Sequence, residues 1–298
     1  MTAPHIAVII PTLNGAATLP ALLAALARAG ERHALEIVAI DSGSRDGTTD
    51  LLRAAGAMVL DLGGRPFGHA SARNRAAAAA HGDVLLYLTQ DVEPAGDDWL
   101  DPLLAALAPA DVAGAFGRQI PRGATPEEAF MVAANYGAEP RTITPQALQA
   151  PFGPGSTFFS HAFGAVKRAV WERIPIPDIV MSEDQAWARD VLRAGQSIRY
   201  VPESAVYHGH RLSLGRAFRR NFDSGSSLEQ LGLTGSVWTA GVSHLARELR
   251  WISVEHGALA VAHAIVYETV RMIGFQCGRM ERALPGAVAR RLGEAPRP

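Results

Sequence analysis

The sequence predicts an α/β fold in which a mostly parallel central sheet carries helices on both faces and a helical extension follows. Two observations support this prediction. Apolar strands and helices alternate from residue 6 to residue 88, which is typical of a doubly wound parallel sheet. The chain of 298 residues is also 48% hydrophobic, which is sufficient to bury the core of one large domain with an appendage.

The first third of the chain gives the clearest elements. Continuous apolar runs predict buried strands, and the helical spacing of apolar residues predicts the helices between them. Strands are expected over residues 6–12, 36–41, 57–60 and 84–88, and helices over residues 17–29, 48–55 with Asp46 as the cap, and 71–80 before Gly82.

The alternation fails after about residue 110. The Gly/Pro-rich segment 151–156 is typical of the long loops that shape a binding cleft, so we expect an acceptor site there. Further on, we expect a short helix over residues 167–173, a longer helix over 183–194, a strand over 197–201 and mainly helix after Gly225.

Composition limits the function classes. The single cysteine, Cys277, excludes an intramolecular disulfide and a cysteine-based zinc cluster, and favours a reducing compartment. Residues 1–11 lack the basic start and the cleavage site of a signal peptide, so a cytoplasmic location is expected. The net charge is −1, although residues 208–298 hold 12 basic and 7 acidic side chains. No basic run is interleaved with aromatic residues, so nucleic acid is not an expected partner.

The loop after the strand 84–88 carries the most informative residue, Asp91. Ligands of α/β sheets bind at the carboxyl ends of strands. A carboxylate there is well placed to hold a divalent cation, and a departing diphosphate requires such a cation. The alternative is that Asp91 only caps the turn before Pro94.

Four motifs resemble those of the family 2 glycosyltransferases, in the same order and with matching spacing. The resemblance covers roughly residues 5–225 and implies a GT-A fold, a nucleotide-binding α/β sandwich, and inversion at the anomeric centre. The motifs are Pro11-Thr-Leu-Asn-Gly15, Ile40-Asp-Ser-Gly-Ser-Arg-Asp-Gly-Thr48, Thr89-Gln-Asp91 and Ser182-Glu-Asp184. Three further segments are similar to bacterial rhamnosyltransferases of surface-polysaccharide assembly: Phe67-Gly-His69, Ala72-Arg-Asn74 and Phe218-Arg-Arg-Asn-Phe-Asp-Ser-Gly225.

The resemblance also implies a division of the chain. Residues 1–225 would form the catalytic domain, with a nucleotide-sugar-binding half over 1–110 and an acceptor-binding half over 111–225. Residues 226–298 would form a C-terminal helical region.

The expected donor site gathers residues that follow the first strands. Asp41 ends the second strand and would accept a hydrogen bond from N3–H of uracil or thymine, or it caps the turn 42–46. Thr12 and Asn14 would face the same nucleotide, with ordinary turn chemistry as the alternative. Arg73 would meet phosphate, and Asn74 would satisfy a sugar or a backbone group. The remaining residues assigned to this donor site are Pro11, Gly43, His69 and Gln90.

A metal site is expected at Asp91. Many family members have Asp-x-Asp where this chain has Thr89-Gln90-Asp91, so one carboxylate is replaced by a neutral side chain. One Asp, a diphosphate, water and a distant His still complete the shell of Mg²⁺ or Mn²⁺. His208 and His210 are the candidates, with His208 preferred, because alternate residues of an extended segment share one face.

The resemblance assigns the general base to Asp184, with Glu183 binding the acceptor or orienting the site. Both residues begin a predicted helix, so capping is a sufficient alternative explanation. Arg219 or Arg220 would reach the donor diphosphate. The Gln-x-x-Arg-Trp motif of processive synthases is absent, which favours the addition of a single sugar.

The predicted function is inverting transfer of a sugar, expected to be L-rhamnose from dTDP-L-rhamnose, to a lipid-linked or polysaccharide acceptor. The alternatives are a UDP-hexose donor, a nucleotidyltransferase, and a catalytically degenerate glycan-binding protein. A nucleotidyltransferase normally has a Gly-rich, basic phosphate loop near its first strand, and residues 11–15 do not form one.

The C-terminal region is expected to contact a membrane surface. The apolar stretch 257–267 is too short to span a bilayer, because Glu268 and Arg271 follow it. Packing of this helix against the catalytic domain, or against a second subunit in a homodimer, is the alternative. An interfacial helix is supported by Val266, Val270, Ile273 and Cys277 at helical spacing, with Arg250, Arg271, Arg279 and Arg282 beside them.

Overall fold

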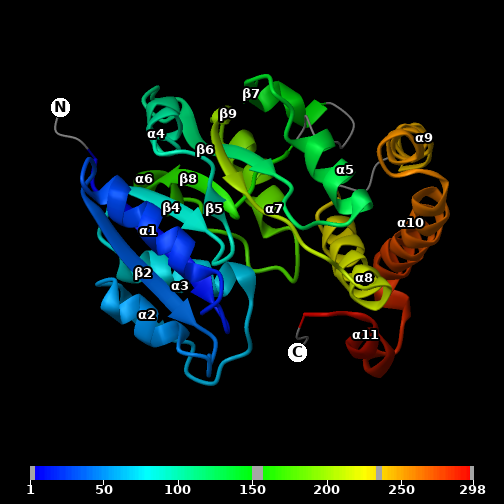
Figure 1. Ribbon diagram of the computed structural model, residues 1–298, viewed down its shortest axis with the longest axis horizontal. Coiled ribbons are helices and arrows are strands. Elements are labelled where there is room, and N and C mark those ends of the chain that lie inside the picture. Colours follow the sequence, from blue (N-terminus) through cyan, green and yellow to red (C-terminus); the bar gives the residue numbers. More distant parts are fainter. Residues whose placement is uncertain (1–3, 150–156, 233–236, 296–298) are drawn as a thin grey trace. The chain divides into compact units, whose positions relative to one another are not determined.

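The computed structural model describes residues 4–149, 157–232 and 237–295 (Figure 1). The loop expected over residues 151–156 therefore lies outside the described residues. The chain forms two compact units. The first unit is Met1–Gln119, Gly137–Asp178 and Glu183–His208, and the second is Ile120–Tyr136, Ile179–Ser182 and Gly209–Pro298. The division into functional regions at residue 225 stays a prediction.

The first unit contains a mixed sheet with the strand order β3-β2-β1-β4-β8-β6-β9-β5, and β7 pairs with β9. Its parallel part is β1 (Ile6–Thr12), β2 (Leu35–Asp41), β3 (Met58–Asp61) and β4 (Val84–Leu88). Its later strands are β5 (Glu93–Pro94), β6 (Val112–Ile120), β7 (Arg141–Ile143), β8 (Phe163–Lys167) and β9 (Ser197–Tyr207).

The predicted α/β class is confirmed, but the parallel pairs shown among the described residues, β1–β2, β1–β4 and β2–β3, all belong to the first four strands. The pairs β4–β8, β6–β8, β5–β9 and β7–β9 are antiparallel. The loss of strand–helix alternation after about residue 110 explains the difference, because parallel neighbours need crossover connections that this part of the chain does not repeat.

Helices pack on the parallel part where the sequence predicts them. Ile6, Val8 and Ile10 of β1 are fully buried and share a core cluster with Leu22 and Leu26 of α1. Burial of each such side chain contributes roughly 1.5–3 kcal/mol. The helices of this unit are α1 (Leu19–Gly30), α2 (Thr48–Ala54), α3 (His69–Ala79), α4 (Asp101–Ala106), α6 (Arg168–Trp171) and α7 (Glu183–Arg193).

Two of the differences between predicted and observed boundaries affect residues of the expected site. Helix α3 starts at His69 rather than at residue 71, so His69 is its first residue. Strand β9 continues to Tyr207 instead of ending at Val201. Pro202 and Glu203 interrupt the apolar pattern, yet Ser204 and Val206 are buried, so the strand carries the chain directly to His208.

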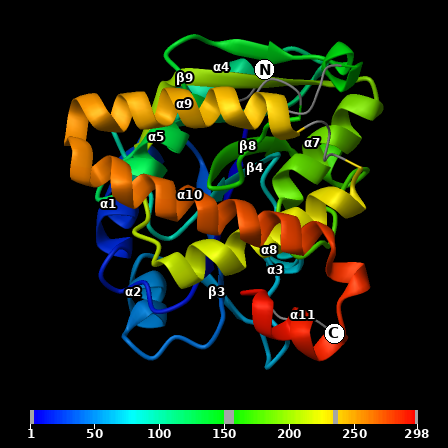
Figure 2. The ribbon, with the colours of Figure 1, turned by 90° about the vertical axis from the view of Figure 1, so that its right-hand side faces the viewer.

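The second unit is helical (Figure 2). Three glycines allow α8 and α10 to cross with their backbones in contact: a Cβ at Gly225, Gly274 or Gly278 would overlap a carbonyl oxygen of the other helix. The helices of this unit are α5 (Pro126–Asn135), α8 (Leu214–Gln230), α9 (Val237–His256), α10 (Ala258–Arg279) and α11 (Gly286–Leu292).

Helix α10 corrects the expectation of a short apolar stretch. It runs unbroken for 22 residues and, among the described helices, is the one long and apolar enough to cross a membrane by length and composition. Glu268 and Arg271 do not interrupt its outer surface, because Arg271 Nη1 pairs with Glu268 Oε1 at 2.6 Å and both side chains are mostly buried. Arg271 is therefore not one of the exposed flanking arginines.

Candidate active site

A pocket of about 190 Å³ opens at the carboxyl ends of β1, β2 and β4 in the first unit. Ligands of open α/β sheets bind in this position. Six of the predicted site residues line it: Pro11, Thr12, His69, Arg73, Gln90 and Asp91. The other lining residues are Leu13, Ser42, Phe67 and Thr89.

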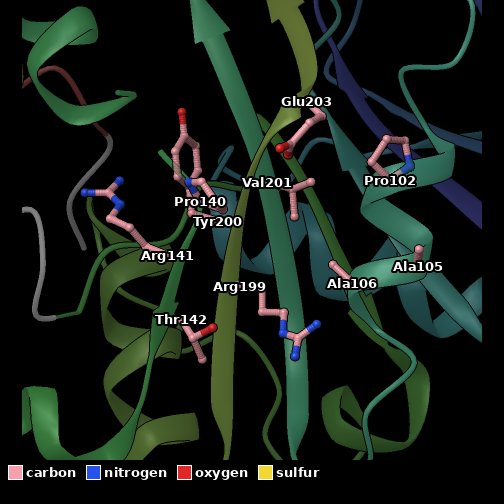
Figure 3. Close-up of a pocket in the computed structure, with 10 residues that line it drawn as sticks. All are labelled: Pro102, Ala105, Ala106, Pro140, Arg141, Thr142, Arg199, Tyr200, Val201 and Glu203. Carbon is pink, nitrogen blue, oxygen red and sulfur yellow. The ribbon is translucent and has the colours of Figure 1, made fainter. Parts of the chain in front are cut away.

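A larger hollow of about 480 Å³ lies between α4, β7 and β9 of the same unit (Figure 3). There the Arg141 guanidinium lies 4.7 Å from the centroid of the Tyr200 ring, while Arg199 and Glu203 project from β9. None of the predicted site residues is among the described residues that line this hollow. The smaller pocket is therefore the candidate active site.

Asp41 ends β2 behind this pocket and is 5% exposed. Its carboxylate accepts the backbone N–H groups of Gly43 (2.9 Å) and Ser44 (2.8 Å) and the hydroxyl groups of Ser44 (2.5 Å) and Thr12 (3.2 Å). Burial alone would raise the pKa of Asp41, but the hydrogen bonds from Ser44, Gly43 and Thr12 lower it overall. The carboxylate is thus ionised and held in one orientation, which agrees with its expected role in the turn. Its contact with a base stays a prediction.

Asn14 connects the loop after β1 to the loop after β2. It has a positive φ of 48°, its N–H donates to Ser44 Oγ at 2.7 Å, and its side-chain oxygen accepts the N–H of Arg45 at 3.0 Å. Gly43, with a φ of 99°, makes the turn that brings Ser44 into reach. Asn14 therefore has a structural role, and its contact with the nucleotide stays a prediction.

The start of α3 forms another wall of the pocket. The His69 ring packs against Phe67 in a T-shaped arrangement, 4.8 Å between centroids. Asn74 is directed elsewhere: it donates to Ile176 O at 2.7 Å and accepts the indole N–H of Trp171 at 2.8 Å and the N–H of Ile176 at 3.1 Å. Asn74 therefore satisfies backbone and indole groups, and its contact with a sugar stays a prediction.

Asp91 and His208 come together from the loops after β4 and β9. His208 Nε2 lies 3.5 Å from Asp91 Oδ1, and each side chain offers one ligand atom for a metal ion. Neighbouring ligands of an octahedral ion with bonds of about 2.1 Å lie about 3 Å apart. The pair is therefore close to the spacing that one divalent ion requires.

Gln119 on β6 sets the orientation of His208. Gln119 Nε2 donates to Ser160 Oγ at 2.9 Å, so its Oε1 faces His208 Nδ1 at 2.8 Å. With Gln119 Oε1 as the acceptor, Nδ1 carries the proton, and in a neutral imidazole the lone pair of Nε2 then lies on the side of Asp91. Hydrogen bonds of this kind fix the tautomer of metal-binding histidines, so the residues present fit a divalent metal ion.

Three predicted residues belong to the second unit. His210 follows His208 by two residues, and Arg219 and Arg220 are exposed on α8. Their expected contacts with the metal ion and the diphosphate stay predictions.

A buried ion pair joins the pocket wall to α7. Arg73 Nη1 lies 2.6 Å from Glu183 Oε1, and the two side chains are only 5% and 8% exposed. Since Arg73 lines the pocket and Glu183 is the first residue of α7, this pair fixes the start of that helix beside the pocket. Removing one partner of a buried pair is strongly destabilising, because the other charge remains buried.

Asp184 follows Glu183 and is half-buried. Its Oδ1 accepts the N–H of Gln185 at 2.8 Å. Burial and the neighbouring Glu183 carboxylate raise the pKa of Asp184 to about 7, while Arg73 acts in the opposite direction. A carboxyl group with a pKa near neutral is suited to accept a proton during catalysis.

Sequence reasoning did not identify Ser44 or Gln119. The Asp41-x-x-Ser44 spacing carried a signal for Ser44, because an Asp commonly accepts hydrogen bonds from the residues that follow it in a turn. Gln119 gave no local signal, because it reaches His208 only through the assembly of the sheet.

Residues 7–174, more than half of the chain, match the model of the family Glycosyl transferase family 2. The O-antigen chain rhamnosyltransferase RfbN of Salmonella typhimurium is 26% identical over 295 residues, covering 96% of this chain and 93% of the relative. The O-antigen chain rhamnosyltransferase WbaN of Salmonella anatum is 25% identical over 264 residues, covering 86% and 83%.

Two solved structures share the fold. A mannosyltransferase, PcManGT from Pyrobaculum calidifontis in complex with GDP-Man and Mn²⁺, superposes with a TM-score of 0.61 at 19% identity, covering 95% of this chain and 88% of that chain. Glucosyl-3-phosphoglycerate synthase from Mycobacterium tuberculosis with Mn²⁺ and UDP-Glc gives 0.53 at 20% identity, covering 78% and 81%. The family match, together with the predicted GT-A fold that these structures confirm, shows that the chain belongs to glycosyl transferase family 2 and is a glycosyltransferase.

Proposed function

We propose that this glycosyltransferase transfers L-rhamnose from dTDP-L-rhamnose to a glycan acceptor, lipid-linked or polysaccharide, with inversion at the anomeric carbon. One observation supports the proposal most strongly. Asp91, a candidate metal ligand, and Arg73, which positions the Glu183–Asp184 segment, line the same pocket. The similarity to two O-antigen chain rhamnosyltransferases over most of the chain favours rhamnose as the sugar.

The donor would bind with its base near Asp41 and its diphosphate near Asp91. The ionised Asp41 would accept N3–H of thymine, and the ring of His69 at the pocket wall would lie against the donor. Uracil presents the same N3–H group, so Asp41 alone does not discriminate between dTDP and UDP donors.

Asp91 and His208 would hold Mg²⁺ or Mn²⁺, and a bound ion neutralises charge on the departing diphosphate. The Gln119 hydrogen bond keeps His208 in the tautomer that binding requires. These two side chains thereby compensate for the neutral residue at Thr89, where many family members have a carboxylate.

Asp184 would act as the general base. The acceptor hydroxyl oxygen attacks the anomeric carbon, the bond from that carbon to the diphosphate oxygen breaks, and the hydroxyl proton passes to the Asp184 carboxylate. The raised pKa of Asp184 increases its affinity for that proton, and the Arg73–Glu183 pair holds the helix that carries it.

Donor identity is tested with the purified protein and a panel of dTDP-L-rhamnose, UDP-glucose and GDP-mannose, each with Mg²⁺ and with Mn²⁺. We expect dTDP-L-rhamnose to raise the melting temperature and to be the donor that is consumed. A clear response to UDP-glucose without one to dTDP-L-rhamnose would contradict the rhamnosyl assignment and favour the UDP-hexose alternative. The anomeric configuration of the product, read by NMR, tests inversion.

We further propose that α10 contacts a membrane surface on the cytoplasmic side, where a lipid-linked acceptor would be presented. Its outer surface is apolar: Leu259 is 90% exposed, and Ile265, Val266, Met272, Ile273 and Met280 are each about half exposed or more. Arg282, Arg290 and Arg291, in the segment that follows α10 in the sequence, are exposed and supply the positive charge that binding to anionic lipid requires.

Sedimentation with anionic liposomes tests this contact. The double variant Val266→Asp with Ile273→Asp should release the protein into the supernatant, whereas the matched variant Met58→Asp, at an exposed position of β3, should not. Liposome binding that survives the double variant would reject membrane contact through α10. A dimer in light scattering that the double variant dissociates would favour the second subunit as the partner instead.

A further inference from the structure

The loops that carry Leu13 and Asp91 follow neighbouring parallel strands. β1 and β4 pair from Ile6 with Val84 up to Ile9 with Tyr87. Beyond this point β1 continues along β2, whereas the chain after β4 turns toward β8, where the N–H of Thr89 donates to Ala162 O at 3.2 Å. The ladder between β1 and β4 therefore ends before the two loops begin.

The side chain of Gln90 joins the two loops beyond the end of this ladder. Gln90 Oε1 accepts the N–H of Leu13 at 2.9 Å, and Gln90 Nε2 donates to the carbonyl oxygen of Leu13 at 2.9 Å. The amide thus satisfies both backbone groups of one residue. An ionised Glu at this position would accept from the N–H but would bring a second oxygen against the carbonyl of Leu13.

Gly15 leaves the space that the amide occupies. A Cβ at Gly15 would lie 2.5 Å from Gln90 Oε1 and 2.8 Å from Gln90 Cδ. Gly15 does not have a positive φ, so the requirement for glycine is space and not backbone conformation. The two hydrogen bonds to Leu13 therefore depend on both the amide at position 90 and the absence of a side chain at position 15.

We propose that Gln90 is a positioning residue that fixes the Asp91 loop to the Thr12–Leu13 loop, so that nucleotide and divalent cation bind with mutual dependence. The inference rests on the proposed function. A nucleoside diphosphate with its base near Asp41 and its phosphates near Asp91 spans both loops. Holding the loops at a fixed separation before binding lowers the entropy lost on binding both ligands. By linkage, Mn²⁺ then raises nucleotide affinity by the same factor as nucleotide raises Mn²⁺ affinity.

Two variants break the Gln90–Leu13 bonds by different routes. Gln90→Met keeps a similar volume without hydrogen bonds, and Gly15→Ala displaces an unchanged Gln90. Gly30→Ala is the matched control, because nothing lies within 4 Å of a Cβ there. For each protein we would measure hydrogen exchange at the Leu13 amide and the dissociation constants of dTDP and UDP, with and without Mn²⁺.

We expect Leu13 exchange to accelerate about tenfold or more in both variants, and the Mn²⁺-dependent gain in nucleotide affinity to fall about fivefold or more. Gln90→Glu, which sets a carboxylate oxygen against the carbonyl of Leu13, should change both quantities in the same direction. Gly30→Ala should match the wild type in both measurements.

Unchanged Leu13 exchange in Gln90→Met and Gly15→Ala would overturn the bridge itself. Faster exchange with an unchanged Mn²⁺-dependent gain would overturn its role in coupled binding. Wild-type protein that binds neither dTDP nor UDP in Mn²⁺ would contradict the proposed function and with it the coupling, while the exchange rates would still decide whether Gln90 joins the loops.

Discussion

Asp41 and Asp184 belong to the same unit but have opposite environments. Asp41 accepts four hydrogen bonds, which lower its pKa, whereas Asp184 accepts one backbone N–H beside the Glu183 carboxylate, and burial raises its pKa to about 7. An aspartate held ionised by many donors is suited to fix a ligand, and one with a high proton affinity is suited to accept a proton. The environment, and not the residue type, separates the two roles.

The largest expected effect is on turnover. Asp184→Asn keeps the shape of the side chain but removes the proton acceptor, so kcat should fall by about 10²–10⁴ while the donor dissociation constant stays near the wild-type value. Steady-state kinetics with titration of dTDP-L-rhamnose measures both quantities. If Glu183→Gln abolishes turnover and Asp184→Asn does not, the base is Glu183, and the raised pKa of Asp184 does not mark the proton acceptor.

The second effect concerns the metal pair. Chelation should abolish activity, and Mn²⁺ or Mg²⁺ should restore it, because the leaving diphosphate loses charge neutralisation without the ion. Asp91→Asn should lower kcat by about 10²–10³, and His208→Ala should have a milder effect. Asp97→Asn, at an exposed side chain, is the control. Full activity in excess chelator would leave Arg219 or Arg220 to neutralise the diphosphate.

The third effect tests the hydrogen bonds that hold the Asp41 carboxylate. Asp41→Asn can keep one oxygen for the N–H groups of Gly43 and Ser44, but its NH2 group then faces the hydroxyl groups of Ser44 and Thr12 that donate to Oδ1. Stability should therefore fall by about 1–3 kcal/mol and donor affinity should weaken. Asp61→Asn is a matched control, because Asp61 also ends a strand and accepts a backbone N–H, from Gly63 at 2.6 Å, but is exposed. Equal losses of unfolding free energy in urea for Asp41→Asn and Asp61→Asn would show that the buried Asp41 contributes no more to stability than an exposed aspartate does.

The sequence predicted the elements and residues that depend on local pattern. β1 and β4 lie at the predicted residues, because a continuous apolar run bounded by turn residues defines a buried strand. The Asp91 loop follows β4 as expected. The antiparallel pairing was not predicted, because pairing direction depends on connections whose lengths carry no local signal.

Contacts between distant residues were also outside the reach of the sequence. Arg73 and Glu183 are 110 positions apart, and Leu13 and Gln90 are 77 apart. The sequence assigned Arg73 and Gln90 to the donor site and Glu183 to the acceptor or to a helix cap, but it did not indicate these contacts. Only the assembled sheet shows that Arg73 lies against the segment that bears Asp184 and that Gln90 reaches the loop after β1.

The smallest expected effect is a shift in pH dependence. With Asp184 as the base, kcat should fall tenfold per pH unit below about pH 7 and level off above it, because only the ionised carboxylate accepts the proton. Glu183→Gln removes the negative neighbour that raises this pKa, so the fall in kcat should move to lower pH.

Asp184 and Asp41 should also affect stability in opposite directions. Because the pKa of Asp184 is raised, its contribution to the free energy of unfolding is favourable at low pH and is lost as pH rises from about 4 to about 7. Because the pKa of Asp41 is lowered, its contribution is favourable above about pH 4 and is lost as pH falls below that value. Unfolding free energies of Asp184→Asn and Asp41→Asn measured from pH 3 to pH 8 test both signs, since each variant should lose the corresponding pH dependence. Parallel pH profiles in the two variants would mean that the aspartates share one environment.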